Sequence, residues 1–164
     1  MMRKARSQSR TGFTLIELVV TVAIIGLLAT LVLPMTELVV KRQKEHELRL
    51  ALREIRTALD TYKQDVDDGR IDQSLEKSGY PATLEVLVDG VQDKLSPDGN
   101  SKIYFLRRIP RDPFFPDSSK PNQDTWGLRS YQSSADSPEE GDDVFDVYSR
   151  NQGVGLNGIP YKNW

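Results

Sequence analysis

A long apolar run near the start of the chain limits its possible folds more than any other feature. The run extends from Phe13 to Met35, and its stretch from Leu18 to Leu33 contains no charged residue. As a helix, these 23 residues would be about 35 Å long, which is enough to cross a bilayer. The basic residues before the run predict that its N-terminal end stays cytoplasmic and that the rest of the chain lies across the membrane.

A glutamate, Glu17, stands inside this run. A carboxylate near the bilayer centre costs roughly 2.5–3.5 kcal/mol on insertion scales, and a buried charge needs a partner. Either Glu17 meets a charge partner in an assembly, or it reaches the nearby headgroups. A plain single-pass anchor explains the run but gives the acid no purpose.

The residues around Glu17 form a specific pattern. Gly12 separates a basic leader, residues 1–12, from Phe13, and "FTLIEL" and Pro34 follow. This arrangement resembles the type III signal of type IV pilins and type II secretion pseudopilins. The resemblance implies that a prepilin peptidase cuts after Gly12 and methylates the new N-terminal residue, Phe13, to N-methylphenylalanine.

The same resemblance implies that Glu17 and Pro34 serve assembly. Cleavage creates an α-amine beside the apolar run, and the amine of a neighbouring subunit's Phe13 is a suitable partner for Glu17 when helices pack with an axial stagger. Pro34 removes a backbone hydrogen bond and is expected to kink or loosen the helix. A snorkelling Glu17 and a proline kink without a role stay open as alternatives.

The helix is predicted to continue past the apolar run, from about Thr14 to Gln64, and to end near Gly69. Apolar residues recur at spacings of three and four and form one face of its second half. These residues are Leu48, Ala51, Leu52, Ile55, Ala58, Leu59 and Tyr62. The sequence therefore predicts a helix with a membrane half and an amphipathic half.

Charged residues on the second half are expected on its solvated face. Glu45 with Arg49, and Arg56 with Asp60, have the i,i+4 spacing of helical ion pairs. His46 is expected to be solvated.

Shorter elements are predicted after the helix. A short helix is expected from Pro81, with Gly90 as its stop. Strands are expected over 126–133 and 143–149, with a last edge strand over 159–164.

The later part of the chain resembles the G-type major pseudopilin of type II secretion. The resemblance rests on "DDGRI", "YPATLEVLV", "LRRIPRDPF", the W-G-x-R-S-Y segment and "FDVYS" before a Gly-rich end. It implies an α+β, pilin-like fold with a long N-terminal helix packed on a small antiparallel sheet. The expected organisation is a cleaved leader over 1–12, a membrane and assembly half over 13–35, and a periplasmic head over 36–164. Residues 71–79 look inserted relative to the family, and their role stays open.

Composition argues against several other classes of protein. Without the leader the chain has 18 Lys and Arg against 24 Asp and Glu, which is unfavourable for nucleic acid. There is no cysteine and a single histidine, so neither a thiol nucleophile nor a His-based metal or triad site is available. We expect no enzyme activity and no catalytic residues.

The predicted function is that of a structural subunit of a type II secretion pseudopilus, which polymerises through its N-terminal helix to drive protein export. The expected partners are further copies of the chain, other pseudopilins, the inner-membrane assembly platform, the prepilin peptidase and membrane lipid. The expected location is the bacterial inner membrane, with one span and a periplasmic head. A type IV pilin and a membrane-tethered periplasmic binding module are the alternatives.

Calcium is the point where this sequence and its family differ. G-type pseudopilins typically hold one Ca²⁺ in the loop after the F-D-x-Y-S strand, but residues 149–164 contain no Asp or Glu. Because Ca²⁺ takes about six to eight oxygens, with charged ones setting its affinity, we expect no metal and no cofactor. We expect a loop closed by glycine turns, with Tyr161 and Trp164 packed on it. A substitute site in the preceding turn is the alternative, formed by Asp142, Asp143 and Asp146.

Overall fold

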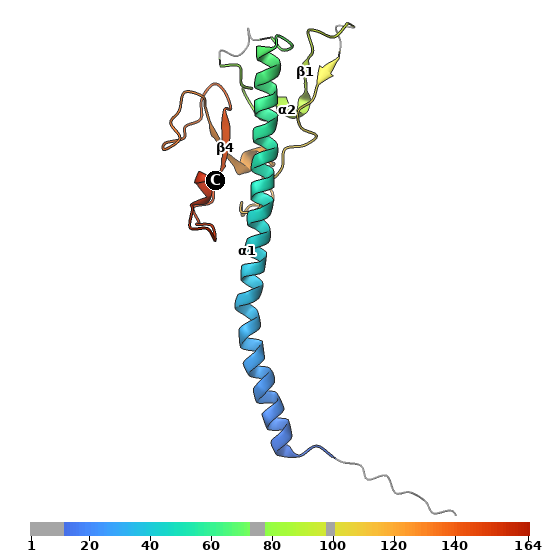
Figure 1. The fold of residues 1–164 in the computed structure, drawn as a ribbon, viewed down its shortest axis with the longest axis vertical. Helices are drawn as coiled ribbons and strands as arrows, with labels where there is room; N and C mark the ends of the chain where they lie inside the picture. Colours follow the sequence, from blue (N-terminus) through green and yellow to red (C-terminus); the bar gives the residue numbers. More distant parts are fainter. Residues whose placement is uncertain (1–11, 73–77, 98–100) are drawn as a thin grey trace, which may run out of the picture. The chain divides into compact units, whose positions relative to one another are not determined.

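A computed structural model of the chain describes residues 12–72, 78–97 and 101–164, and for residues 31–35 it describes no side chains. The chain divides into two compact units, Met1–Lys41 and Arg42–Trp164. We call the second unit the head. The long helix α1 contributes residues to both units (Figure 1).

Helix α1 comprises Leu15–Asp67. The predicted helix is therefore confirmed, and it is three residues longer at its C-terminal end than Gln64. The amide of Asp68 still donates to the carbonyl of Gln64 at 2.8 Å, and Gly69 follows with a φ of 75°. Glycine adopts this left-handed conformation without a steric penalty, so Gly69 ends the helix as predicted.

The apolar face predicted on α1 is the centre of the head's core. Each of its seven residues is at most 6% exposed, and Leu48 and Ile55 are fully buried. They form one cluster with Trp126, Val147 and Tyr161 from the later elements. Burial of a large apolar side chain contributes roughly 1.5–3 kcal/mol, so this face fixes the helix in the head. His46 is exposed, as expected.

The second helix is shorter and begins later than predicted. Helix α2 comprises Val86–Asp89 and ends at Gly90, whose φ is 74°. The prediction that Pro81 opens the helix is wrong. Pro81 is buried, and its carbonyl accepts the amide of Val144 at 2.8 Å. The backbone at Pro81 therefore binds the segment that leads into strand β4 (Asp146–Ser149) and does not begin a helix.

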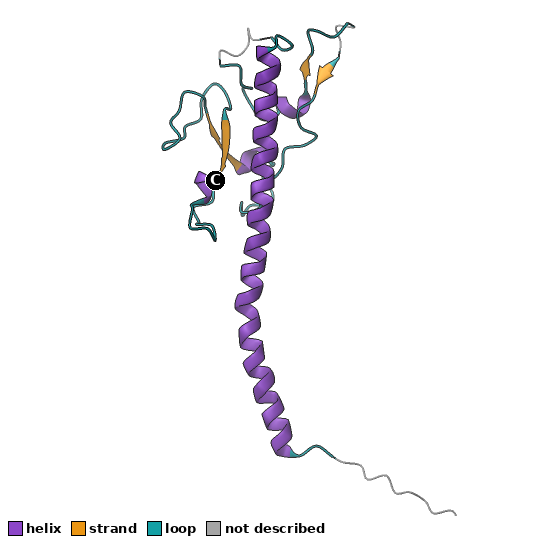
Figure 2. Cartoon of the chain, in the orientation of Figure 1, coloured by secondary structure: helices purple, strands orange, loops and turns teal. Residues whose placement is uncertain are grey.

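Two antiparallel strand pairs make up the described sheet content (Figure 2). Strands β1 (Val91–Gln92) and β2 (Lys102–Ile103) form a small pair that the sequence analysis did not predict. Strands β3 (Trp126–Arg129) and β4 (Asp146–Ser149) were predicted and lie within the expected segments. In Figure 1, α1 lies between the region of β1 and that of β4. The head therefore has the expected α+β architecture.

Strand β3 follows the 3-10 helix η2 (Gln123–Thr125) and pairs in register with β4. Gly127 lies opposite Tyr148, and a Cβ at Gly127 would come within 2.3 Å of the tyrosine ring. The ring therefore packs directly on the glycine backbone, which only glycine permits.

The prediction of a last edge strand over 159–164 is wrong. Tyr161–Asn163 form the 3-10 helix η3, and only an isolated bridge joins Val154 to Pro160. Proline has no amide to donate to a strand ladder. The amide of Tyr161 instead donates to the carbonyl of Gly153 at 3.1 Å, which folds the segment back on itself.

Candidate functional site

The predicted processing residues lie at the exposed start of the described chain. Gly12 and Phe13 precede α1, and Phe13 is 82% exposed. A Cβ added at Gly12 would have no atom within 4 Å. The junction that a peptidase would have to reach is therefore accessible.

Glu17 lies in the first turn of α1. Its amide donates to the hydroxyl of Thr14 at 3.3 Å, and the amide of Leu18 donates to the carbonyl of Thr14 at 3.2 Å. Thr14 and Glu17 have the spacing of a capping box, in which a Thr caps the helix and a Glu stands three residues later. The Thr14-x-x-Glu17 spacing is a sequence signal for a helix start that was not recognised, and it places Glu17 at the positive end of the helix dipole.

Apolar side chains of the first unit are exposed along α1 and immediately before it. They include Phe13, Leu15, Ile16, Leu18, Val19, Val20, Val22, Ile24, Ile25, Leu27, Leu28, Leu38, Val39 and Val40, all at least 48% exposed. Consecutive residues point in different directions around a helix, so these side chains surround it. A helix that is apolar on all sides is normally buried in a membrane or in a bundle of helices.

The segment predicted to span the membrane is described only in part. Within the described residues, no helix is both long enough and apolar enough to cross a bilayer. Helix α1 continues through residues 31–35, but their side chains, including that of Pro34, lie outside the description. The predicted role of Pro34 stays a prediction.

In the head, Arg56 ties α1 to the last strand. Its Nε donates to Oδ1 of Asp146 at 2.7 Å, and Nη2 of Arg129 donates to the other oxygen, Oδ2, at 3.1 Å. The expectation that Arg56 pairs with Asp60 is therefore wrong. Asp146 is thus held at both carboxylate oxygens, each by a different arginine, which fixes its geometry better than a flexible pair along one helix.

Glu45 is likewise not on the solvated face. It is 5% exposed, and its Oε1 accepts the amide of Leu156 at 2.8 Å and the hydroxyl of Tyr161 at 2.9 Å. The expected pair with Arg49 is wrong. Glu45 stands three residues before Leu48, which is on the buried face, and this helical spacing is the signal that could have found it.

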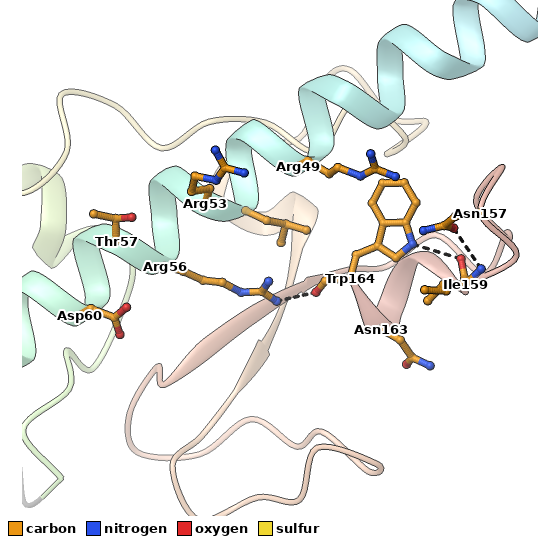
Figure 3. A pocket seen from close by; sticks show the side chains of 10 residues that line it. Arg49, Arg53, Arg56, Thr57, Asp60, Asn157, Ile159, Asn163 and Trp164 are labelled. Atoms are coloured by element: carbon orange, nitrogen blue, oxygen red, sulfur yellow. Dashed lines mark hydrogen bonds between the residues drawn. The ribbon is translucent and has the colours of Figure 1, made fainter.

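Arg49 packs instead against Trp164, with its guanidinium carbon 4.4 Å from the indole centroid. Trp164 also accepts a hydrogen bond at its carbonyl from Nη2 of Arg56 at 2.7 Å, and its Nε1 donates to the carbonyl of Ile159 at 3.1 Å. Figure 3 shows these residues around a surface pocket of about 480 Å³. This pocket marks the seam where the C-terminal residues meet α1.

A buried carboxylate also supports the end of β4. Asp112 is 1% exposed, and its Oδ2 accepts the hydroxyl of Ser149 at 2.6 Å while its Oδ1 accepts the amide of Phe114 at 2.8 Å. Burial raises the pKa of Asp112, and the two hydrogen bonds lower it in part. Asp112 therefore joins the segment before η2 to the strand that leads into the C-terminal residues.

Two of the three acids of the alternative calcium site, Asp143 and Asp146, already accept hydrogen bonds from other parts of the head. Both oxygens of Asp146 accept hydrogen bonds from arginines, and Oδ1 of Asp143 accepts the amide of Tyr131 at 2.8 Å. Within residues 12–72, 78–97 and 101–164, no three acidic or histidine side chains are grouped in a way that could hold a metal ion.

The chain is similar to known proteins over its N-terminal segment and over about two thirds of its length. Residues 7–33 match the family described as the prokaryotic N-terminal methylation motif. Three similar proteins carry the name type II secretion system core protein G. The one from Pseudomonas aeruginosa is 34% identical over 65% of this chain and 70% of its own length. The one from Klebsiella michiganensis is 32% identical over 66% of this chain and 71% of its own length. The one from Vibrio cholerae is 32% identical over 69% of this chain and 70% of its own length. No solved structure matches the chain.

Proposed function

Because this chain belongs to the family of type II secretion system core protein G, the major pseudopilins, we propose that it is a structural subunit of a secretion pseudopilus. The subunit polymerises through the N-terminal part of α1 and so drives protein export across the outer membrane. The chain has no catalytic role in this proposal.

The observation that carries the proposal is the apolar surface of the first unit. Phe13 and Leu15 are each 82% exposed, and Leu27 is 67% exposed. Such a helix is stable only in lipid or against other apolar helices. A stack of identical helices supplies that environment, and head-to-tail contacts between identical subunits generate a helical filament.

The processing and assembly residues fit this scheme. Cleavage after Gly12 leaves the apolar helix in the mature protein and places an α-amine on Phe13. Glu17 then pairs with that amine in the neighbouring subunit, so that its charge is satisfied in the polymer. Pro34 allows the packed helix to loosen during assembly.

The location and partners follow from the same scheme. The protein is anchored by one span in the inner membrane, with its head in the periplasm. Its partners are further copies of the chain, other pseudopilins, the inner-membrane assembly platform, the prepilin peptidase and lipid. The acidic balance outside the leader supports the absence of nucleic acid from this set.

A substitution at the processing site tests the proposal. Gly12→Val meets no neighbouring atom, so it leaves the head intact while blocking cleavage. In a host that lacks the wild-type gene, we expect loss of secretion, loss of filaments and a chain that keeps residues 1–12 by mass spectrometry. Ser9→Val in the leader serves as the control. Normal secretion by an uncleaved Gly12→Val chain would contradict the proposal and indicate a simple membrane tether.

A further inference from the structure

The last part of the head, residues 150–164, is attached to α1 through a buried carboxylate. We call this part the C-terminal loop. Glu45 accepts two hydrogen bonds from it, one from the amide of Leu156 at 2.8 Å and one from the hydroxyl of Tyr161 at 2.9 Å. Both donors reach the same oxygen, Oε1, and Glu45 and Tyr161 are 5% and 3% exposed. At Glu45 the loop therefore presents hydrogen-bond donors, not oxygen acceptors, to the helix.

Several oxygens of the C-terminal loop accept hydrogen bonds from within the loop. Oδ1 of Asn151 accepts the amide of Gly153 at 2.7 Å, and Oδ1 of Asn157 accepts the amide of Ile159 at 3.1 Å. The carbonyl of Ile159 accepts the amide of Gly155 at 2.9 Å. A calcium ion needs about six to eight oxygens that converge on one point, several of them charged. These side chains are neutral and point into local turns, so they do not fit the ion that the family resemblance implies.

The charges around the loop also oppose a cation. Arg150 and Lys162 belong to the loop, and Arg49 lies on the ring of Trp164. The nearest acid of the preceding strand, Asp146, already binds two guanidinium groups. Arg150 pairs with Glu140 at 3.2 Å outside the loop, and the loop itself contributes positive side chains and no side-chain carboxylate.

We propose that Glu45 anchors the C-terminal loop in place of a bound cation. The charge at the attachment is then negative and belongs to the helix, whereas a bound cation would be positive and would need oxygens from the loop. The helix supplies a fixed anion, and the loop supplies an amide and a hydroxyl that converge on it. This inference concerns the head by itself and stands whether or not the proposed polymer function holds.

The surroundings of Tyr161 hold its ring in place and keep its hydroxyl protonated, so that it stays bonded to Glu45. Its ring stacks on Phe114 with centroids 4.3 Å apart and meets Trp164 edge-on at 5.1 Å. Burial and the hydrogen bond to Glu45 raise the pKa of Tyr161 to about 12. The hydroxyl therefore keeps its proton, and remains a donor to Glu45, at neutral pH.

A glycine brings the loop amide close to the carboxylate. A Cβ at Gly155 would lie 2.3 Å from Cζ2 of Trp164. Only glycine permits this contact, which sets the backbone immediately before Leu156 and directs its amide to Glu45.

Amide hydrogen exchange of the full chain in detergent, read by mass spectrometry on residues 150–164, tests the proposal. We expect the same exchange rate in excess CaCl₂ and in excess chelator. Glu45→Ala removes the shared acceptor, and exchange should rise about ten- to hundredfold, as for loss of hydrogen bonds to a charged group. Glu47→Ala is the matched control, because Glu47 is exposed on the same helix and accepts a surface bond from Gln43.

Two results would overturn the proposal. One is slower exchange of the C-terminal loop in CaCl₂ than in chelator, which would assign its attachment to a cation. The other is exchange in Glu45→Ala equal to that in Glu47→Ala. If Glu45→Ala does not fold, Tyr161→Phe decides, since it keeps the ring and the carboxylate and removes one donor. It should raise exchange about tenfold, and an unchanged rate would overturn the proposal equally.

Discussion

Arg56 and Asp146 are 90 residues apart in the sequence, and their side chains meet at 2.7 Å between Nε and Oδ1. Nη2 of the same arginine donates to the carbonyls of Val147 at 3.1 Å and Trp164 at 2.7 Å. Arg129 binds the second oxygen of Asp146. One arginine thus fixes α1 to β4 and to the end of the chain.

Loss of the Asp146 charge should destabilise the head. Asp146→Asn leaves Arg56 and Arg129 without their shared counter-charge, at positions where the side chains are 36% and 18% exposed. Because solvent screens part of the interaction, we expect a loss of about 1–3 kcal/mol in the free energy of unfolding. Urea unfolding followed by circular dichroism measures it. Asp142→Asn, at an exposed acid before the same strand, should change it by less than about 0.5 kcal/mol. Equal losses in both variants would refute a specific role for Asp146.

This pair also shows what the sequence could and could not predict. Rules for neighbours on one helix pointed to Asp60 as the partner of Arg56, because they consider no other element. The actual partner became available only when β4 packed on the apolar face of α1. The length of α1, its end at Gly69 and its buried face were predictable because local spacing and one glycine determine them.

The C-terminal residues illustrate the opposite case. Apolar and aromatic residues between 159 and 164 suggested a strand, but Pro160 cannot continue a ladder. The conformation depends on two distant contacts, that of Tyr161 with Glu45 and that of Trp164 with Arg49. Glu45 itself was detectable in principle, since its spacing from Leu48 and Leu52 places it on the buried face.

The stability of the head should fall at alkaline pH partly because of Tyr161. Its pKa is raised to about 12 in the folded chain, against about 10 for an ordinary tyrosine. The folded state therefore holds this proton more tightly than the unfolded state. The resulting contribution to stability is complete below about pH 10 and is lost as the pH rises towards about 12.

Tyr161→Phe isolates this contribution. The variant should be less stable than the wild type at neutral pH, and the difference should shrink between about pH 10 and pH 12. Urea midpoints measured across this range provide the comparison. Burial also raises the pKa of Tyr80. Because Tyr80 is present in both proteins, its contribution cancels in the difference between their stabilities. A difference that stays constant up to about pH 12 would contradict the raised pKa of Tyr161.

Two substitutions at Glu17 separate its charge from its position in the helix cap. Glu17→Gln keeps a side chain suited to a capping box with Thr14 but removes the charge, whereas Glu17→Ala removes both. If the charge pairs with a neighbouring amine, both variants should be cleaved and inserted normally and should assemble poorly. Removal of the charge lowers the cost of insertion, so insertion cannot be the step that fails. Chemical cross-linking of membranes measures assembly, with Glu37→Gln on the same helix as the control. Normal assembly of Glu17→Gln would assign the role to the cap, and normal assembly of both variants would mean that Glu17 only reaches the headgroups.

Removal of the first unit should leave a folded, monomeric head. A chain that begins at Arg42 lacks the exposed apolar residues from Phe13 to Val40 but keeps the buried face from Leu48 to Tyr62. We expect a soluble protein of monomeric mass by light scattering, with the helical circular dichroism of the head. Glu45 then lies in the first turn, where a carboxylate is favourable to the helix dipole. A second chain that begins at Glu37 controls for fraying of this turn and should give the same mass. Polymers formed by the chain that begins at Arg42 would show that contacts between heads, and not the apolar half of α1, drive assembly.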